Sequence, residues 1–174
     1  MSPAAWIPAL AGALLATALT GPDAGATAAN PAPVTVPAIR SWQGGEGTWR
    51  LTTHSRIVLD AEDRGSLRGT AEQLAEELDD QEGMRPAVTT GRPRVGDVAL
   101  DLTTNGPTPS KESYTLGIGP AARVSAAGRA GVLYGTRTLL QALRTAPVAR
   151  VVARGTVRDW PTQASRGQML DVGR

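Results

Sequence analysis

The spacing of apolar residues changes twice along this chain, and that change most constrains the fold. In residues 66–82, leucines and alanines recur at intervals of four, three and four, which is the pattern of one helix face. Residues 128–144 carry a second apolar stripe of this kind. The intervening segments are short, and several alternate between apolar and polar residues, which indicates strands. The pattern predicts an α/β layer of α+β type, in which a mixed β-sheet carries two helices on one face.

The predicted order of elements is β-β-α-β-β-β-β-α-β, with one extra strand afterwards. Residues 34–39, which Pro37 interrupts, are expected to form an edge strand or a leader. The glycine-rich residues 44–47 are expected to form a turn. The predicted strands are residues 48–53, 56–60, 86–89, 97–102, 112–118, 123–126, 148–157 and, as the extra strand, 168–172.

Four small residues predict where the first helix begins and ends and how the second helix packs. Ser66 is expected to cap the first helix and Gly83 to end it. In the second helix Gly131 and Gly135 lie four residues apart, and therefore on one face. Because glycine has no side chain, we expect a neighbouring backbone to approach this face closely.

Residues 1–28 are predicted to be a secretory signal peptide. The apolar residues 4–19 are followed by a small-residue run with two Ala-x-Ala cleavage patterns in residues 24–28. The apolar run is too short for a membrane span, so no membrane partner is expected. One feature departs from the pattern, because no basic residue precedes Arg40. Cleavage would release a secreted, extracellular protein that begins with a leader at residues 29–33; a disordered alanine-rich leader is the alternative.

The composition excludes several chemistries. With no cysteine and one histidine, His54, the chain can hold neither a disulfide scaffold nor a thiolate or multi-histidine metal site. We therefore expect no metal and no cofactor. The arginines of the loop, at positions 85, 92 and 94, are not interleaved with aromatic residues, so no nucleic-acid partner is expected.

Paired carboxylates are the remaining candidates for acid–base catalysis. They occur at Glu76 with Glu77, at residues 79–80, and at Asp60 with Asp63. The first two pairs fall on the polar face of the first predicted helix, and the third falls in a loop. Charges in such places usually serve solubility, so residues 30–160 are not expected to contain an active site.

Four motifs carry a resemblance to a known family. Residues 166–174 read Arg-Gly-Gln-Met-Leu-Asp-Val-Gly-Arg, and residues 159–161 read Asp-Trp-Pro. Residues 112–116 read Glu-Ser-Tyr-Thr-Leu, and residues 130–141 contain Ala-Gly-x-x-Tyr-Gly-x-x-Thr-Leu-x-Gln. Together they resemble the family 20 glycoside hydrolases, the β-N-acetylhexosaminidases.

The resemblance implies a division into two domains. Residues 34–160 would form the family's zincin-like N-terminal accessory domain, a name that describes topology and implies no metal. Residues 161–174 would begin the catalytic (β/α)8 domain, a TIM barrel truncated after its first strand. The chain would then be an N-terminal fragment of the parent enzyme.

The family removes terminal β-linked N-acetylglucosamine or N-acetylgalactosamine by substrate-assisted retaining catalysis. The resemblance implies that its catalytic Asp-Glu pair lies on a later barrel strand, so this chain holds no catalytic residue and should be inactive alone. Arg174 matches the arginine that hydrogen-bonds the sugar hydroxyls at C3 and C4, a role suited to a rigid donor fork. Asp171 fits a structural barrel carboxylate. The implied partners are N-acetylhexosamine-terminated glycans or chitooligosaccharides, bound by the full-length parent.

Two other functions remain open. A stand-alone secreted carbohydrate-binding or interaction module would present clustered aromatic rings, whereas the aromatic residues here are spread in sequence from Trp6 to Trp160. A related barrel glycosidase acting on O-linked N-acetylglucosamine could carry a similar first domain. The Met-Leu-Asp-Val-x-Arg run at residues 169–174 argues against this second alternative.

Overall fold

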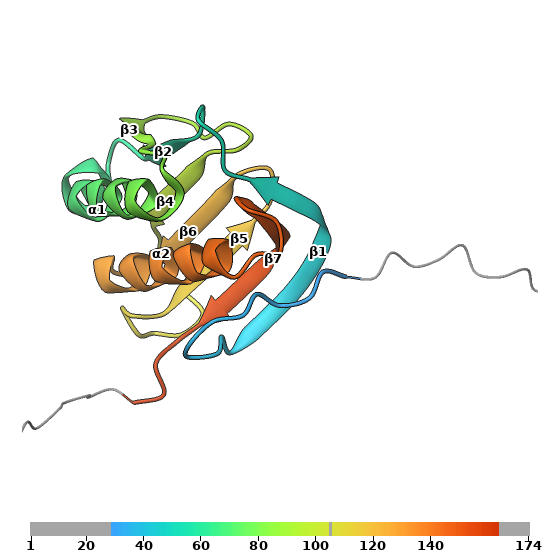
Figure 1. The fold of residues 1–174 in the computed structure, drawn as a ribbon. Coiled ribbons are helices and arrows are strands. Elements are labelled where there is room, and N and C mark those ends of the chain that lie inside the picture. Colours follow the sequence, from blue (N-terminus) through green and yellow to red (C-terminus); the bar gives the residue numbers. More distant parts are fainter. Residues whose placement is uncertain (1–28, 105, 164–174) are drawn as a thin grey trace, which may run out of the picture.

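The computed structural model describes residues 29–104 and 106–163, which form one mixed seven-stranded sheet with two helices (Figure 1). The predicted order of the first nine elements is confirmed. The predicted signal peptide and the extra strand at 168–172 lie outside the described residues. The elements are β1 (Ser41–Arg50), β2 (Arg56–Leu59), α1 (Arg64–Glu82), β3 (Ala87–Thr90), β4 (Val98–Leu102), β5 (Tyr114–Ile118), β6 (Ala122–Ala126), α2 (Arg129–Arg144) and β7 (Val151–Asp159).

The strands follow the order β1-β7-β5-β6-β4-β2-β3 across the sheet. Pairing is parallel from β6 through β4 and β2 to β3, and antiparallel from β6 through β5 and β7 to β1. Helix α1 connects β2 to β3, and helix α2 connects β6 to β7. Both helices cover the same face of the sheet and contact each other, as predicted (Figure 1). Neither is long and apolar enough to cross a lipid bilayer.

The core lies between the sheet and the helices and consists mainly of branched aliphatic side chains. Burial of each such side chain contributes about 1.5–3 kcal/mol. The helices supply Leu67, Leu74, Leu78, Val132, Leu139 and Leu143, and the strands supply Leu59, Leu100, Leu116, Val124 and Val157, among others.

The other face of the sheet is polar. In the row where Leu116 pairs with Val124 and Val157, all three side chains are buried. One residue further along β5, Gly117 pairs with Arg123 and Thr156, none of which is buried. Because successive side chains of a strand point to opposite faces, this alternation leaves the second face open to solvent.

The prediction of a turn at residues 44–47 is wrong, because these residues lie inside β1. The register of β1 against β7 shifts between Gly44 and Thr48, and Gly47 has a φ of 76°. A glycine with positive φ can form a bulge that bends a strand without reversing it. The side chain of Asn30 supports this bulge by donating hydrogen bonds to the carbonyl oxygens of Gly47 (2.7 Å) and Arg154 (3.0 Å).

Residues 34–39 form a leader rather than an edge strand. The leader lies beside the C-terminal half of α2, where the backbone N–H of Val36 donates to Oε1 of Gln141 at 2.7 Å. The hydroxyl of Thr145 donates to the carbonyl oxygen of Val34 at 3.1 Å. Both contacts use side chains of the helix end, so the leader is held without strand pairing.

The N-cap predicted at Ser66 is also wrong, whereas Gly83 ends the helix as predicted. Helix α1 begins at Arg64 after Asp63, whose carboxylate accepts a hydrogen bond from the backbone N–H of Leu102 at 2.7 Å. The side chain that precedes the helix therefore joins it to β4 and does not cap it. Gly83 adopts a left-handed conformation with φ 66°, and its N–H donates to the carbonyl of Asp79.

An ion pair with a buried carboxylate joins β2 to the start of β4. The carboxylate of Asp97, which is buried, accepts hydrogen bonds from Nη2 of Arg56 at 2.5 Å and from the backbone N–H of Arg94 at 2.7 Å. Burial alone would raise the pKa of Asp97. The hydrogen bonds outweigh that effect, so the pKa of Asp97 lies below its usual value.

Candidate functional site

Three of the sequence motifs meet at one end of the sheet. Tyr114 of β5 pairs with Asp159, the last residue of β7, and α2 packs against both strands. The phenolic hydroxyl of Tyr114 donates to Oδ2 of Asp159 at 3.1 Å and accepts from the hydroxyl of Thr138 at 2.5 Å. The motifs at residues 112–116, 130–141 and 159–161 thus share one hydrogen-bond network.

Burial determines the chemistry of this network. The Tyr114 side chain is only 3% exposed, and this burial, together with the neighbouring Asp159 carboxylate, raises the pKa of Tyr114. The hydrogen bond with Thr138 opposes the shift but does not cancel it. Tyr114 therefore remains a neutral donor at physiological pH, and its role in this network is structural.

The glycines of the second motif bring α2 against this network, as their spacing predicted. A Cβ atom at Gly131 would lie 2.4 Å from the carbonyl oxygen of Ser113, and one at Gly135 would lie 2.4 Å from Cγ1 of Val124. Real Cβ atoms do not approach other atoms so closely. Glycine at both positions is thus required for the observed distance between α2 and the sheet.

Beside the network lies a cavity of about 680 Å³, which we call the terminal cavity. It lies between the segment that leads into β1 and the segment that follows β7, because its walls come from residues 37–40, from α2 and from residues 159–162. Its polar and aromatic lining includes Arg40, Tyr134, Arg137, Gln141, Asp159 and Trp160.

The segment before β1 and the segment after β7 are bound to each other at this cavity. The guanidinium of Arg40 lies 5.4 Å from the centre of the Trp160 ring, and its Nε donates to the carbonyl oxygen of Trp160 at 2.8 Å. Arg40 also hydrogen-bonds the hydroxyl of Thr162. Arg40, in the segment before β1, thereby holds the segment that follows β7 in place.

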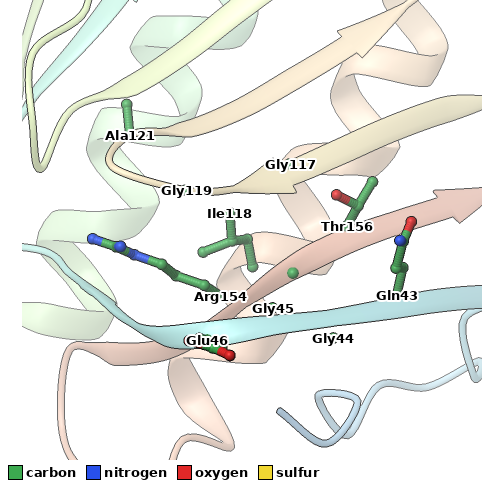
Figure 2. Close-up of a pocket in the computed structure, with 11 residues that line it drawn as sticks. Gln43, Gly44, Gly45, Glu46, Gly117, Ile118, Gly119, Ala121, Arg154 and Thr156 are labelled. Carbon is green, nitrogen blue, oxygen red and sulfur yellow. The ribbon is translucent and has the colours of Figure 1, made fainter. Parts of the chain in front are cut away.

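A second hollow, of about 520 Å³, lies between β1, β7 and the turn from β5 to β6 (Figure 2). The hollow exists because the glycines of β1 and β5 that line it have no side chains to fill it. The polar side chains of Gln43, Glu46, Arg154 and Thr156 surround it. The hollow contains a single carboxylate and no histidine. It can therefore donate and accept hydrogen bonds, but it lacks a pair of groups for acid–base catalysis.

Two of the other candidates for catalysis form ion pairs. Glu76 pairs with Arg85 at 3.1 Å, and Glu77 pairs with Arg137. His54 is exposed in the turn before β2. Within residues 29–104 and 106–163, no group of three histidine, aspartate or glutamate side chains is arranged to hold a metal ion. Arg174, the predicted sugar-binding residue, and Asp171 lie outside the described residues.

The convergence of aromatic residues was not predicted from the sequence. Tyr114, Tyr134 and Trp160 are distant in sequence, yet all three line the terminal cavity. Of the three, Tyr134 is the exposed ring, at 39%. Tyr114 is buried and Arg40 covers a face of Trp160, so the cluster does not form an open platform for stacking on sugars.

The described residues thus form an α+β domain with a polar open sheet face and a cavity between the segment before β1 and the segment after β7. A model of glycosyl hydrolase family 20, domain 2, matches residues 32–160. The chain belongs to this family.

Similar proteins agree with the assignment. A lacto-N-biosidase from Bifidobacterium bifidum is 31% identical over 164 residues, which are 91% of this chain and 14% of that protein. The N-acetyl-β-hexosaminidase of Streptomyces plicatus superposes with a TM-score of 0.60 and is 28% identical, covering 78% of this chain and 28% of that one. The family 20 β-N-acetylhexosaminidase of Streptomyces coelicolor superposes with a TM-score of 0.59 and is 25% identical, covering 77% of this chain and 28% of that one. The chain therefore spans less than a third of the length of each of these proteins.

Proposed function

We propose that this chain is the N-terminal part of a secreted β-N-acetylhexosaminidase and that residues 34–160 are its accessory domain. The observation that carries the proposal is the family 20 match over residues 32–160. The hexosaminidases of two Streptomyces species, which share this fold at 25–28% identity, support the same activity. Secretion rests on the signal-peptide pattern of residues 1–28.

In this proposal the complete polypeptide removes terminal N-acetylhexosamine from glycans or chitooligosaccharides with retention of configuration. The acetamido oxygen of the substrate attacks the anomeric carbon, and an Asp-Glu pair beyond residue 174 orients the acetamido group and acts as general acid/base. Arg174 hydrogen-bonds the hydroxyls of the terminal sugar. The described domain supplies no group to this reaction, so its contribution is to support the domain that follows.

Variants of Arg174 in the complete gene product test the proposed site. A hydrogen bond from a charged donor contributes about 1.5–3 kcal/mol. Arg174→Ala should therefore lower kcat/KM on a chromogenic N-acetyl-β-glucosaminide by roughly 100-fold, because about 1.4 kcal/mol corresponds to a factor of ten. Arg92→Ala, at an exposed loop position outside all four motifs, is the matched control and should leave kcat/KM within about twofold of the unchanged enzyme. An Arg174→Ala enzyme with unchanged kcat/KM would exclude the assigned role.

The curated relative favours a second candidate, a lacto-N-biosidase, which the chain matches at 31% identity. The two activities differ in whether a monosaccharide or a disaccharide leaves. Parallel assays with chromogenic N-acetyl-β-glucosaminide and lacto-N-bioside separate them. Preference for the lacto-N-bioside would replace the first candidate with the second.

A stand-alone carbohydrate-binding module is the remaining alternative. The aromatic residues of the terminal cavity favour it, whereas the cover on Tyr114 and Trp160 opposes it. We expect chitooligosaccharides not to bind the 174-residue chain. Saturable binding in a calorimetric titration would support the module instead.

A further inference from the structure

We propose that the open face of the sheet binds an acidic oligosaccharide, in which a sugar carboxylate pairs with Arg158 and the sugar hydroxyls hydrogen-bond the polar side chains around it. The site lies on three neighbouring strands, and we call it the open-face trough. It consists of Ser41, Gln43, Thr115, Gly117, Thr156 and Arg158. The inference concerns binding alone and does not depend on the activity proposed above.

Strand pairing places the trough residues in two adjacent rows on the same face. In one row Arg158 of β7 lies between Ser41 of β1 and Thr115 of β5. In the other row Thr156, two residues earlier on β7, has the central place. Residues two apart on a strand point to the same face and lie about 7 Å apart. The first row lines a hollow of about 440 Å³ and the second lines the hollow of Figure 2, so the two hollows adjoin.

The polar side chains of the trough have no partner within the described part of the chain. None of the five forms a hydrogen bond or an ion pair with residues 29–104 or 106–163. On the same face of β6, by contrast, Arg123 and Ser125 are both bound to the carboxylate of Asp101. Hydroxyl and amide groups can both donate and accept hydrogen bonds, as the hydroxyls of a sugar do. The unused hydrogen-bonding capacity therefore lies together, between β5 and β1.

The charge of the trough favours an acidic ligand. Arg158 is exposed, and its neighbours in the row are uncharged hydroxyl residues. Among the described residues that line the two hollows, Glu46 is the one carboxylate, and Arg154 of the same hollow offsets its charge. Arg158 thus leaves the trough with a net positive charge. The planar fork of a guanidinium matches the two oxygens of a carboxylate.

Other classes of ligand fit this surface less well. The centre of a protein interface is rich in aromatic and other apolar side chains, and the trough residues include none. Single-stranded nucleic acid and neutral sugars both gain affinity by stacking on exposed rings. Trp160 lines the hollow beside Arg158, but Arg40 lies over its ring at 5.4 Å. Charge and hydroxyl contacts remain, and an acidic oligosaccharide supplies both.

Calorimetric titration of the 174-residue chain with a hexamer of galacturonic acid tests this inference. The methyl ester of the same hexamer is the matched ligand control, because it keeps the sugar chain and lacks the charge. We expect saturable binding of the acid and at least about tenfold weaker binding of the ester, which corresponds to about 1.4 kcal/mol. Hexaglutamate, which has carboxylates but no sugar hydroxyls, should also bind at least about tenfold more weakly.

Variants of the trough locate the site. Arg158→Gln should weaken binding of the acid at least about tenfold, because it removes a charged donor. Thr115→Val should weaken it roughly threefold or more, because it removes one hydroxyl at nearly unchanged volume. Arg92→Gln, in the loop after the edge strand β3, is the matched control and should leave affinity within about twofold. Both arginines are exposed, so neither variant should unfold the domain, which circular dichroism checks.

An absence of saturable binding by the acid would overturn the inference, as would binding that Arg158→Gln leaves unchanged. Equal binding of the methyl ester would replace the acidic ligand with a neutral sugar. Equal binding of hexaglutamate would identify an acidic protein segment as the ligand instead. Tighter binding of an oligothymidylate than of the galacturonate hexamer would overturn the inference in favour of nucleic acid.

Discussion

Replacing one glycine of α2 by alanine should destabilise this domain, although alanine is the better helix former. The Cβ of Gly131→Ala would lie 2.4 Å from the carbonyl oxygen of Ser113 and 2.7 Å from Cβ of Ala126. The carbonyl is backbone and the alanine cannot rotate away, so α2 must move off the sheet by roughly 1 Å to restore the close packing of the interior.

The size of the effect follows from two opposing contributions. Overpacking a well-packed core costs up to about 3 kcal/mol. The cost here should be near that upper limit, because neither the Ser113 carbonyl nor the Ala126 methyl can move aside easily. Exchanging glycine for alanine in a helix returns at most about 1 kcal/mol. The net loss is about 2 kcal/mol, which for a domain of this size lowers Tm by roughly 6–10 °C.

The matched control is Gly69→Ala in α1, where a Cβ atom would meet nothing within 4 Å. Only the helix preference acts there, so the variant should gain about 0.5–1 kcal/mol and roughly 2–5 °C. Thermal unfolding followed by circular dichroism measures both changes on the 174-residue chain. If the two variants shifted Tm in the same direction, the argument that Gly131 is required for close packing would be refuted.

Three other substitutions have defined outcomes. Asp97→Asn should cost about 1.5 kcal/mol at pH 7, because it removes the charge that pairs with Arg56, whose own side chain is partly exposed. Since the folded-state pKa of Asp97 lies below the unfolded value, the wild-type protein loses the ionic part of this stability as the pH falls below about 4, and urea unfolding should show the difference between the two proteins shrinking there. Tyr114→Phe should cost about 2 kcal/mol, because Asp159 loses its buried donor, and should lower the urea midpoint with an unchanged m-value. Asn30→Ala should cost about 1–2 kcal/mol and speed amide exchange in β1 near the bulge; unchanged exchange would show that the two Asn30 hydrogen bonds do not hold it.

Much of the fold could be predicted because hydrophobic periodicity is a local signal. The stripe from Leu67 to Leu78 identifies α1, and the spacing of Gly131 and Gly135 predicts the close approach to the sheet that the structure shows. The errors arose where one local pattern fits two structures. Glycines at 44–47 are compatible with a turn or a bulge, and the choice depends on pairing with β7 more than a hundred residues away.

The candidate site was harder to predict because its contacts are long-range. Tyr114 and Asp159 are 45 residues apart, and the ring of Trp160 meets Arg40 across 120 residues. The sequence motifs include the segments that form the site. The aromatic residues of these segments lie far apart in sequence, so their clustering in space could not be inferred. The cavity itself follows from the contact between residues 37–40 and residues 159–162, which no local pattern indicates.

The most direct test of the proposed function compares the 174-residue chain with the complete gene product on a chromogenic N-acetyl-β-glucosaminide. We predict turnover by the complete product and none by the 174-residue chain, because the catalytic Asp-Glu pair is proposed to lie beyond Arg174. Turnover by the 174-residue chain, or an absence of glycosidase activity in the complete product, would contradict the proposal.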